Sequence, residues 1–153
     1  MDYRKEYEKW LASPALSEDE RTELKALEGN DKEIKARFYG PLEFGTAGLR
    51  GTMYTGLHNM NRHVIRWATQ GFANVIRAEG EEAMKKGVAV CMDCRNHSAE
   101  FARETACVMA ANGIHVRLFE SLRPTPELSF AVREYGCQAG VNVTASHNPK
   151  EYN

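Results

Sequence analysis

The chain has 153 residues, 42% of them hydrophobic and 27% charged, which is the composition of one ordinary globular domain. Its formal net charge is -1, which argues against a module that binds nucleic acid through phosphate electrostatics. No apolar stretch approaches the length of a membrane span, and the N-terminus, Met1 to Glu6, has no apolar signal core, so we expect a cytoplasmic protein with no membrane partner.

Residues 1–40 are predicted to form a helical arm. Apolar and aromatic side chains recur at helical spacing near its start, namely Tyr3, Tyr7, Trp10 and Leu11. Ser17 and Glu20 have the spacing of a capping box, which predicts a second helix, and a third is expected over residues 31–39. Because the arm is highly charged, we expect it to act as a packing brace for a main domain over residues 41–153.

From residue 42 onward, helices and strands are predicted to alternate. Asn61 can cap a long helix with an apolar face. That face carries Val64, Ile65, Ala68, Phe72, Val75 and Ile76. Strands are expected over residues 87–93, 114–119 and 139–144, and Ser98 and Thr125 are expected to cap the two helices between them.

This alternation favours the α/β class, with strands buried between helices. Ligands of such sheets gather at the carboxyl ends of the strands. The loops after Asp93, Phe119 and Thr144 are therefore the ones expected to carry function.

Cys91 and Cys94 form a C-x-x-C pair, with His97 close behind. This pattern could be a redox pair or half of a zinc site. No second ligand pair occurs at zinc-finger spacing, because Cys107 and Cys137 stand alone. We therefore favour reduced, structural thiols.

Ser146 comes just after the last predicted strand, where a nucleophile would face a crevice. A serine hydroxyl is a weak nucleophile without help, and His147, although adjacent in sequence, need not face it. Asn148 can both donate and accept hydrogen bonds, and Pro149 stiffens the loop. No G-x-S-x-G elbow surrounds Ser146, which disfavours a hydrolase triad. These residues leave two alternatives, a reactive serine and a capped turn serine.

Residues 44–51 form a glycine-rich loop. Its glycines would let the backbone approach an anion, and Arg50 could pair with phosphate. The loop matches neither a P-loop nor a dinucleotide fingerprint, so a simple connecting turn is the alternative. Asp93 and Arg95 could contact a substrate, but we favour an ion pair that fixes their own loop.

Four motifs occur in a fixed order: Phe44-Gly-Thr-Ala-Gly-Leu-Arg-Gly51, Asp93-x-Arg-x-x-Ser98, Pro124-Thr-Pro126 and Thr144-Ala-Ser-His-Asn-Pro149. Together they resemble the first domain of the α-D-phosphohexomutases, the phosphoglucomutase and phosphomannomutase family, over about residues 40–153. The last motif is the specific one. The charged arm and residues 123–130 are most similar to the phosphoglucomutase/phosphopentomutase branch. The resemblance implies a three-layer α/β/α domain with a mixed, mostly parallel sheet.

The resemblance also implies an isomerase-class phosphotransferase. Ser146 would be a phosphoserine that donates its phosphoryl group to a sugar phosphate, giving a bisphosphate such as glucose 1,6-bisphosphate, and then recovers the other phosphoryl group. Arg50 would lie near the transferring group, and His147 would handle a proton or position the loop. Thr46 and Asn148 would contact the substrate. Mg²⁺ would be held by the phosphate on Ser146 and by three aspartates of an Asp-x-Asp-x-Asp motif on a later domain.

The sequence departs from the family pattern because it contains no Asp-x-Asp-x-Asp motif. The later sugar-selecting loop and the later phosphate-binding domain are also missing. We therefore expect a fragment that covers the first of four domains, has the remaining domains as partners, and has little or no mutase activity alone. A non-catalytic domain that binds sugar phosphates or a protein is the alternative. Phosphoglucose, phosphomannose and phosphopentose all stay open as substrates.

Overall fold

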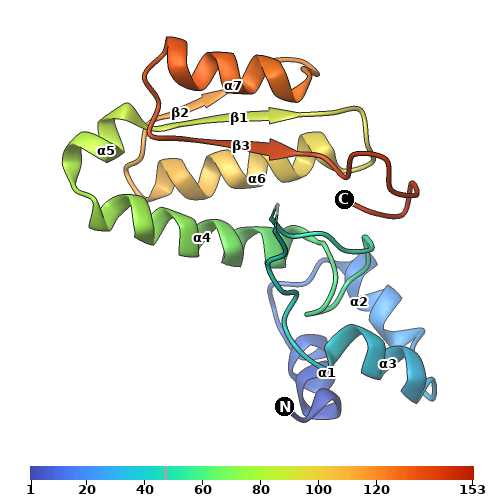
Figure 1. Cartoon of the computed structure of the whole chain (residues 1–153). Coiled ribbons are helices and arrows are strands. Elements are labelled where there is room, and N and C mark those ends of the chain that lie inside the picture. The colour runs from blue at the N-terminus through green and yellow to red at the C-terminus, as the bar shows by residue number, and fades with distance from the viewer. Residues whose placement is uncertain (47) are drawn as a thin grey trace. The chain divides into compact units, whose positions relative to one another are not determined.

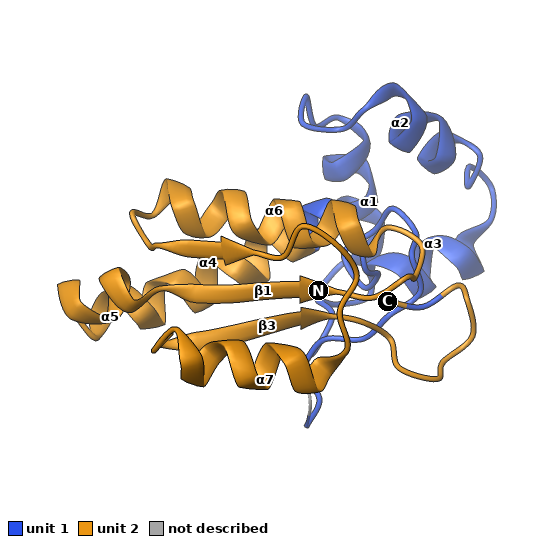
Figure 2. Cartoon of the chain, turned by 90° about the horizontal axis from the view of Figure 1, so that it is seen from above, with its two compact units in different colours: residues 1–64, 152 blue, residues 65–151, 153 orange. Residues whose placement is uncertain are grey.

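The computed structural model describes residues 1–46 and 48–153, and Figure 1 shows the order of their helices and strands. The chain divides into two compact units. Unit 1 comprises residues 1–64 and Tyr152, and unit 2 comprises residues 65–151 and Asn153 (Figure 2). A division into an arm of residues 1–40 and a domain of residues 41–153 stays a prediction.

Unit 1 contains three short helices: α1 (Tyr3–Leu11), α2 (Glu18–Lys25) and α3 (Asp31–Phe38). Each starts after a residue whose side chain accepts a backbone N–H of the first turn. The predicted capping box is present in α2, where the N–H of Ser17 donates to Glu20 Oε2 at 2.7 Å and the N–H of Glu20 donates to Ser17 Oγ at 3.3 Å.

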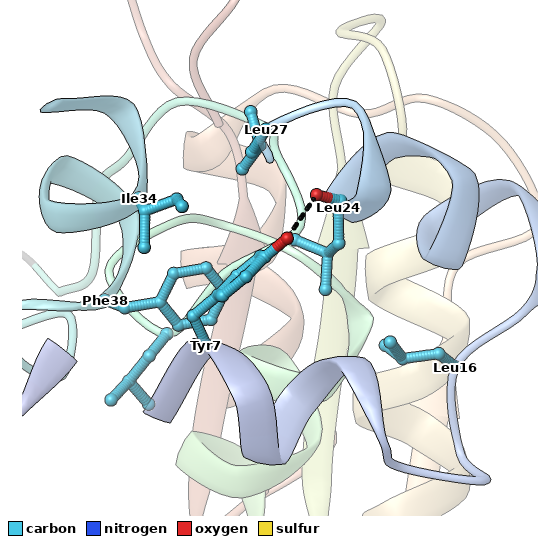
Figure 3. Close-up of a cluster of buried hydrophobic side chains, with 7 residues drawn as sticks. Tyr7, Leu16, Leu24, Leu27, Ile34 and Phe38 are labelled. Carbon is cyan, nitrogen blue, oxygen red and sulfur yellow. Dashed lines mark hydrogen bonds between the residues drawn. The ribbon is translucent and has the colours of Figure 1, made fainter. Parts of the chain in front are cut away.

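The helices of unit 1 enclose an apolar core of their own (Figure 3). Its members are Tyr7, Leu16, Leu24, Leu27, Ile34, Phe38 and Leu57. The ring of Phe38 is fully shielded from solvent and meets the rings of Tyr7 and Trp10 edge-on, at centroid distances of 5.6 and 5.7 Å. The buried hydroxyl of Tyr7 donates to the carbonyl of Leu24 at 3.0 Å. The apolar stripes predicted for the arm thus pack on one another and on Leu57.

Unit 2 contains the alternating helices and strands, except that the first residues of α4 belong to unit 1. They are α4 (Arg62–Ala78), α5 (Glu81–Lys86), β1 (Val88–Met92), α6 (Ser98–Ala111), β2 (Val116–Leu118), α7 (Thr125–Glu134) and β3 (Ala139–Val143). The strand order is β2-β1-β3, and both pairings are parallel. Helices α6 and α7 lie on either side of the sheet (Figure 1), which confirms the α/β class.

The central strand β1 is buried along its whole length. Ala89 and Cys91 pack in one cluster with Leu128 of α7. Since side chains alternate along a strand, Val88, Val90 and Met92 face the other side of the sheet. Coverage of both faces is what makes β1 a nearly continuous apolar run in the sequence.

Asn61 caps α4 as predicted, because its Oδ1 accepts the N–H groups of His63 and Val64, both at 3.1 Å. One member of the expected apolar face is wrong: Val75 is 57% exposed. Helical spacing placed it at the margin of the stripe, and the packing of α4 leaves that margin in solvent.

The predicted caps of α6 and α7 are also wrong. Ser98 and Thr125 are the first residues of these helices, not the residues before them. Their hydroxyl groups make longer-range hydrogen bonds instead: Ser98 donates to Asp93 Oδ1 at 2.8 Å, and Thr125 accepts from Asn142 Nδ2 at 2.6 Å. Among the described residues, no helix is both long and apolar enough to cross a membrane.

Candidate active site

The carboxyl ends of β1 and β3 lie at one edge of the sheet, because the two strands pair in parallel from Val88–Ala139 to Met92–Val143. Two non-glycine residues of the described chain have a positive φ, and both follow these strand ends. They are His97, with φ 61°, and Ser146, with φ 54°. A left-handed backbone costs a non-glycine residue about 1 kcal/mol, so the surrounding structure must impose it. The side chain of Ser146 is exposed.

Asp93, the first residue after β1, organises this edge through three hydrogen bonds. Its carboxylate accepts the hydroxyl of Thr144 at 2.5 Å, the hydroxyl of Ser98 at 2.8 Å and the N–H of Arg95 at 2.9 Å. Thr144 Oγ1 in turn accepts the N–H of Ser146 at 3.0 Å. The carboxylate is therefore connected to the backbone of Ser146 through one hydroxyl group.

These contacts make Asp93 more acidic. Burial opposes its ionisation, but the hydrogen bonds from Thr144, Arg95 and Ser98 favour it, and the pKa of Asp93 lies below its ordinary value of 3.8. Because the folded pKa is lower than the unfolded one, the charged carboxylate stabilises the fold above that ordinary value. This contribution is lost as the pH falls through the folded pKa.

We expect the free energy of unfolding to fall more steeply in the unmodified chain than in Asp93→Asn as the pH drops from about 5 to about 2. The variant lacks the carboxylate whose protonation is linked to unfolding, although it should be less stable at neutral pH. Urea unfolding curves at several pH values measure both slopes. Parallel slopes would contradict a pKa of Asp93 that is lowered by folding.

The structure brings three predicted site residues together in the turn after β3. Ser146 Oγ lies 3.3 Å from His147 Nδ1, and both side chains are exposed. The N–H of Asn148 donates to the carbonyl of Ala145 at 3.1 Å, which closes the turn. Sequence adjacency alone did not decide whether Ser146 and His147 meet, and the left-handed turn at Ser146 lets them do so. The roles of all three residues stay predictions.

The other two predicted site residues, Thr46 and Arg50, belong to unit 1, and both are exposed. Ala47, in the same motif, lies outside the described residues. Gly45 donates its N–H to the carbonyl of Gly48 at 2.8 Å. A Cβ on Gly51 would lie 3.3 Å from the backbone nitrogen of Met60, so the chain passes closely there.

The helices of unit 1 form hydrogen bonds with residues 55–58, which follow this loop, and the sequence did not predict these contacts. The Thr55 hydroxyl donates to Glu23 of α2 at 2.5 Å, and the N–H of His58 donates to the carbonyl of Arg37 at 2.8 Å. The buried guanidinium of Arg37 pairs with Glu23 and, at 2.9 Å, with Glu33. The i,i+4 spacing of Glu33 and Arg37 is a signal in the sequence that could have indicated one of these contacts.

In the C-x-x-C pair, Cys91 has the properties of a structural thiol. The four cysteines are free, and Cys91 is fully buried while Cys94 is exposed. Burial raises the pKa of the Cys91 thiol to about 11, and its Sγ donates to Asn142 Oδ1 at 3.0 Å. A thiol in that state is a poor nucleophile and a poor metal ligand. Within the described residues, no group of three or more His, Cys, Asp or Glu side chains could hold a metal ion.

The sequence model of one protein family, described as phosphoglucomutase/phosphomannomutase, alpha/beta/alpha domain I, matches residues 41–153. This chain belongs to the α-D-phosphohexomutase family. The phosphohexomutase match contains the Ser146 turn, the Asp93 loop and the glycine-rich loop.

Individual relatives support the same family. Human phosphopentomutase is 39% identical in an alignment of 132 residues that covers 82% of this chain and 22% of that protein. A phosphoglucomutase of Staphylococcus saprophyticus is 41% identical over 123 residues, or 80% of this chain and 22% of the relative. A crystal structure from Thermus thermophilus that carries the name phosphomannomutase superposes with a TM-score of 0.66 at 32% identity, covering 74% of this chain and 24% of that one. This phosphohexomutase chain therefore spans less than a quarter of the length of these proteins.

Proposed function

We propose that this chain is the phosphoserine-bearing first domain of a phosphoglucomutase-type enzyme, which interconverts sugar 1-phosphates and 6-phosphates through a bisphosphate. The observation that carries the proposal is the exposed Ser146 hydroxyl in an imposed left-handed turn at the carboxyl end of β3. Strained backbone concentrates where a fold must present a reactive group. Membership of the family supports the same reading.

In the proposed first step, a hydroxyl oxygen of the sugar phosphate attacks the phosphorus on Ser146. The bond between phosphorus and Oγ breaks, its electron pair stays on Oγ, and a proton passes from the attacking hydroxyl to a base while Oγ gains one. The return step reverses this exchange with the other phosphoryl group of the bisphosphate. His147 Nδ1, 3.3 Å from Oγ, is the candidate to exchange the proton at that oxygen.

Charge neutralisation is the other requirement of phosphoryl transfer. Arg50 would contribute to it, and Thr46 and Asn148 would bind the substrate. Mg²⁺, when bound, would neutralise charge on the transferring group. Of its ligands, this chain would supply the phosphate oxygens on Ser146, and the described residues do not form a complete metal site. Aspartates of a later domain would complete it, and those domains would be the partners of this chain.

The sugar stays open. Glucose phosphate is our first candidate, and mannose phosphate and pentose phosphate are the alternatives; relatives named phosphopentomutase align at 39% identity. The aligned part does not decide between them, since a phosphoglucomutase aligns at 41%. A cytoplasmic location also stays a prediction.

Intact-mass measurement after incubation with glucose 1,6-bisphosphate tests the proposal. In an enzyme that contains this domain and the later domains, we expect a gain of the mass of one phosphoryl group, and no gain in its Ser146→Ala variant. Ser121→Ala, which removes another exposed serine, should gain it like the unmodified enzyme. Equal labelling of the Ser146→Ala variant, or no labelling of the unmodified enzyme at saturating bisphosphate, would contradict transfer to Ser146.

A further inference from the structure

We propose that Arg95 is a positioning residue that holds the Ser146 turn in its left-handed conformation. Its guanidinium binds two carbonyl oxygens of that turn: Nη2 donates to Ser146 O at 2.6 Å, and Nη1 donates to Pro149 O at 3.0 Å. One rigid cation thus joins two points of the backbone that lie three residues apart. The proposal goes beyond an ion pair that fixes only the loop of Arg95 itself.

Asp93 also holds Arg95 in this position. The backbone N–H of Arg95 donates to Asp93 Oδ1 at 2.9 Å, and the side-chain Nε of Arg95 lies 4.0 Å from Asp93 Oδ2. The Arg95 side chain is only 16% exposed. Two donor groups therefore face the carbonyls of the turn while the Nε edge faces a carboxylate, an arrangement that suits the planar fork of arginine and not the single ammonium group of lysine.

These bonds offset the conformational cost at Ser146. A left-handed serine is disfavoured by about the worth of one ordinary hydrogen bond, and the guanidinium supplies two charge-assisted ones. The bond to Ser146 O fixes the peptide on one side of the residue, and the bond from Ser146 N–H to Thr144 Oγ1 fixes the other side. With both peptides held, the direction of the Oγ bond is set.

Two of the five side-chain N–H donors of Arg95 bind backbone carbonyls of the turn, so its proposed role is to hold the backbone of the serine. This consequence for the reaction rests on the proposed function. In an enzyme that contains this domain, loss of Arg95 should lower kcat for phosphoryl transfer by more than it raises KM for the sugar phosphate, because the proposed substrate contacts Thr46 and Arg50 lie outside this turn.

Amide NMR of the chain tests the positioning role without any activity. The amides of Ser146 and Asn148 are hydrogen-bonded within the turn, and the backbone shifts of Ser146 report its left-handed conformation. We expect Arg95→Ala and Arg95→Lys to raise hydrogen exchange at these two amides about tenfold or more and to move the Ser146 shifts toward ordinary values. Amides of β1 should keep their protection.

Arg123→Lys is the matched control. This guanidinium binds Ser121, Leu122 and Glu127 within its own segment, so the Ser146 signals should not change. Unchanged Ser146 shifts and exchange in both Arg95 variants would overturn the proposal, as would equal loss of protection at every amide of unit 2. Failure of bisphosphate labelling in the unmodified enzyme would count against the proposed function and not against this role of Arg95.

Discussion

Replacing Gly87 with alanine should destabilise the chain by about 2–6 kcal/mol, through a strained backbone that costs about 1–3 kcal/mol and an enforced shift that costs about 1–3 kcal/mol. Gly87 lies between α5 and β1 with φ 70° and ψ -162°, a region that is essentially restricted to glycine. A Cβ placed there would be 2.1 Å from the carbonyl oxygen of His115. That oxygen accepts the N–H of Val88 at 2.8 Å, so relief of the clash would disturb the start of the sheet.

Gly136→Ala separates the two contributions. Gly136 also has a positive φ, 60°, but a Cβ there would meet no atom within 4 Å, so only the conformational cost of about 1–2 kcal/mol is expected. Urea unfolding followed by circular dichroism gives both values. Equal losses in the two variants would show that the backbone near Gly87 can move away from the added methyl group.

Replacing Phe38 with alanine should destabilise unit 1 by about 3–5 kcal/mol, because the ring is fully buried and its removal leaves a cavity. The edge contacts with Tyr7 and Trp10 would be lost at the same time. Trp10 reports on the event directly, since its ring centroid lies 5.7 Å from that of Phe38. Tryptophan fluorescence during urea unfolding is therefore the appropriate measurement.

Phe44→Ala is the control for this substitution. Phe44 belongs to the same unit but is 71% exposed, so its loss should change stability by no more than about 0.5 kcal/mol. A loss below about 1 kcal/mol in Phe38→Ala would contradict a core centred on this ring.

Local signals in the sequence predicted the elements well. The capping box of Ser17 and Glu20, the Asn61 cap and the apolar run of β1 each depend on neighbours within a few residues, and each is present. The predicted caps Ser98 and Thr125 failed for the opposite reason. Their hydroxyl groups bond to Asp93 and Asn142, and no local pattern shows that those partners are near.

The candidate site could be predicted only in part, because some of its contacts join residues that are far apart in the sequence. The resemblance and the strand ends indicated Ser146, and the family is confirmed. The hydrogen bonds that hold the Ser146 turn could not be predicted. The guanidinium of Arg95 binds carbonyl groups 51 and 54 positions away, and every residue has a backbone carbonyl, so the sequence does not show which ones are bound. The positive φ of Ser146 was hidden likewise, since serine does not favour it.

The left-handed turn at Ser146 has a consequence for protein engineering. A search for more stable variants would favour glycine there, since glycine adopts a positive φ without strain. The same change would delete the hydroxyl that we assign to phosphoryl transfer. At this residue stability and activity therefore make opposing demands, and stabilising substitutions are better sought in the helices of unit 1 or on the exposed face of α4.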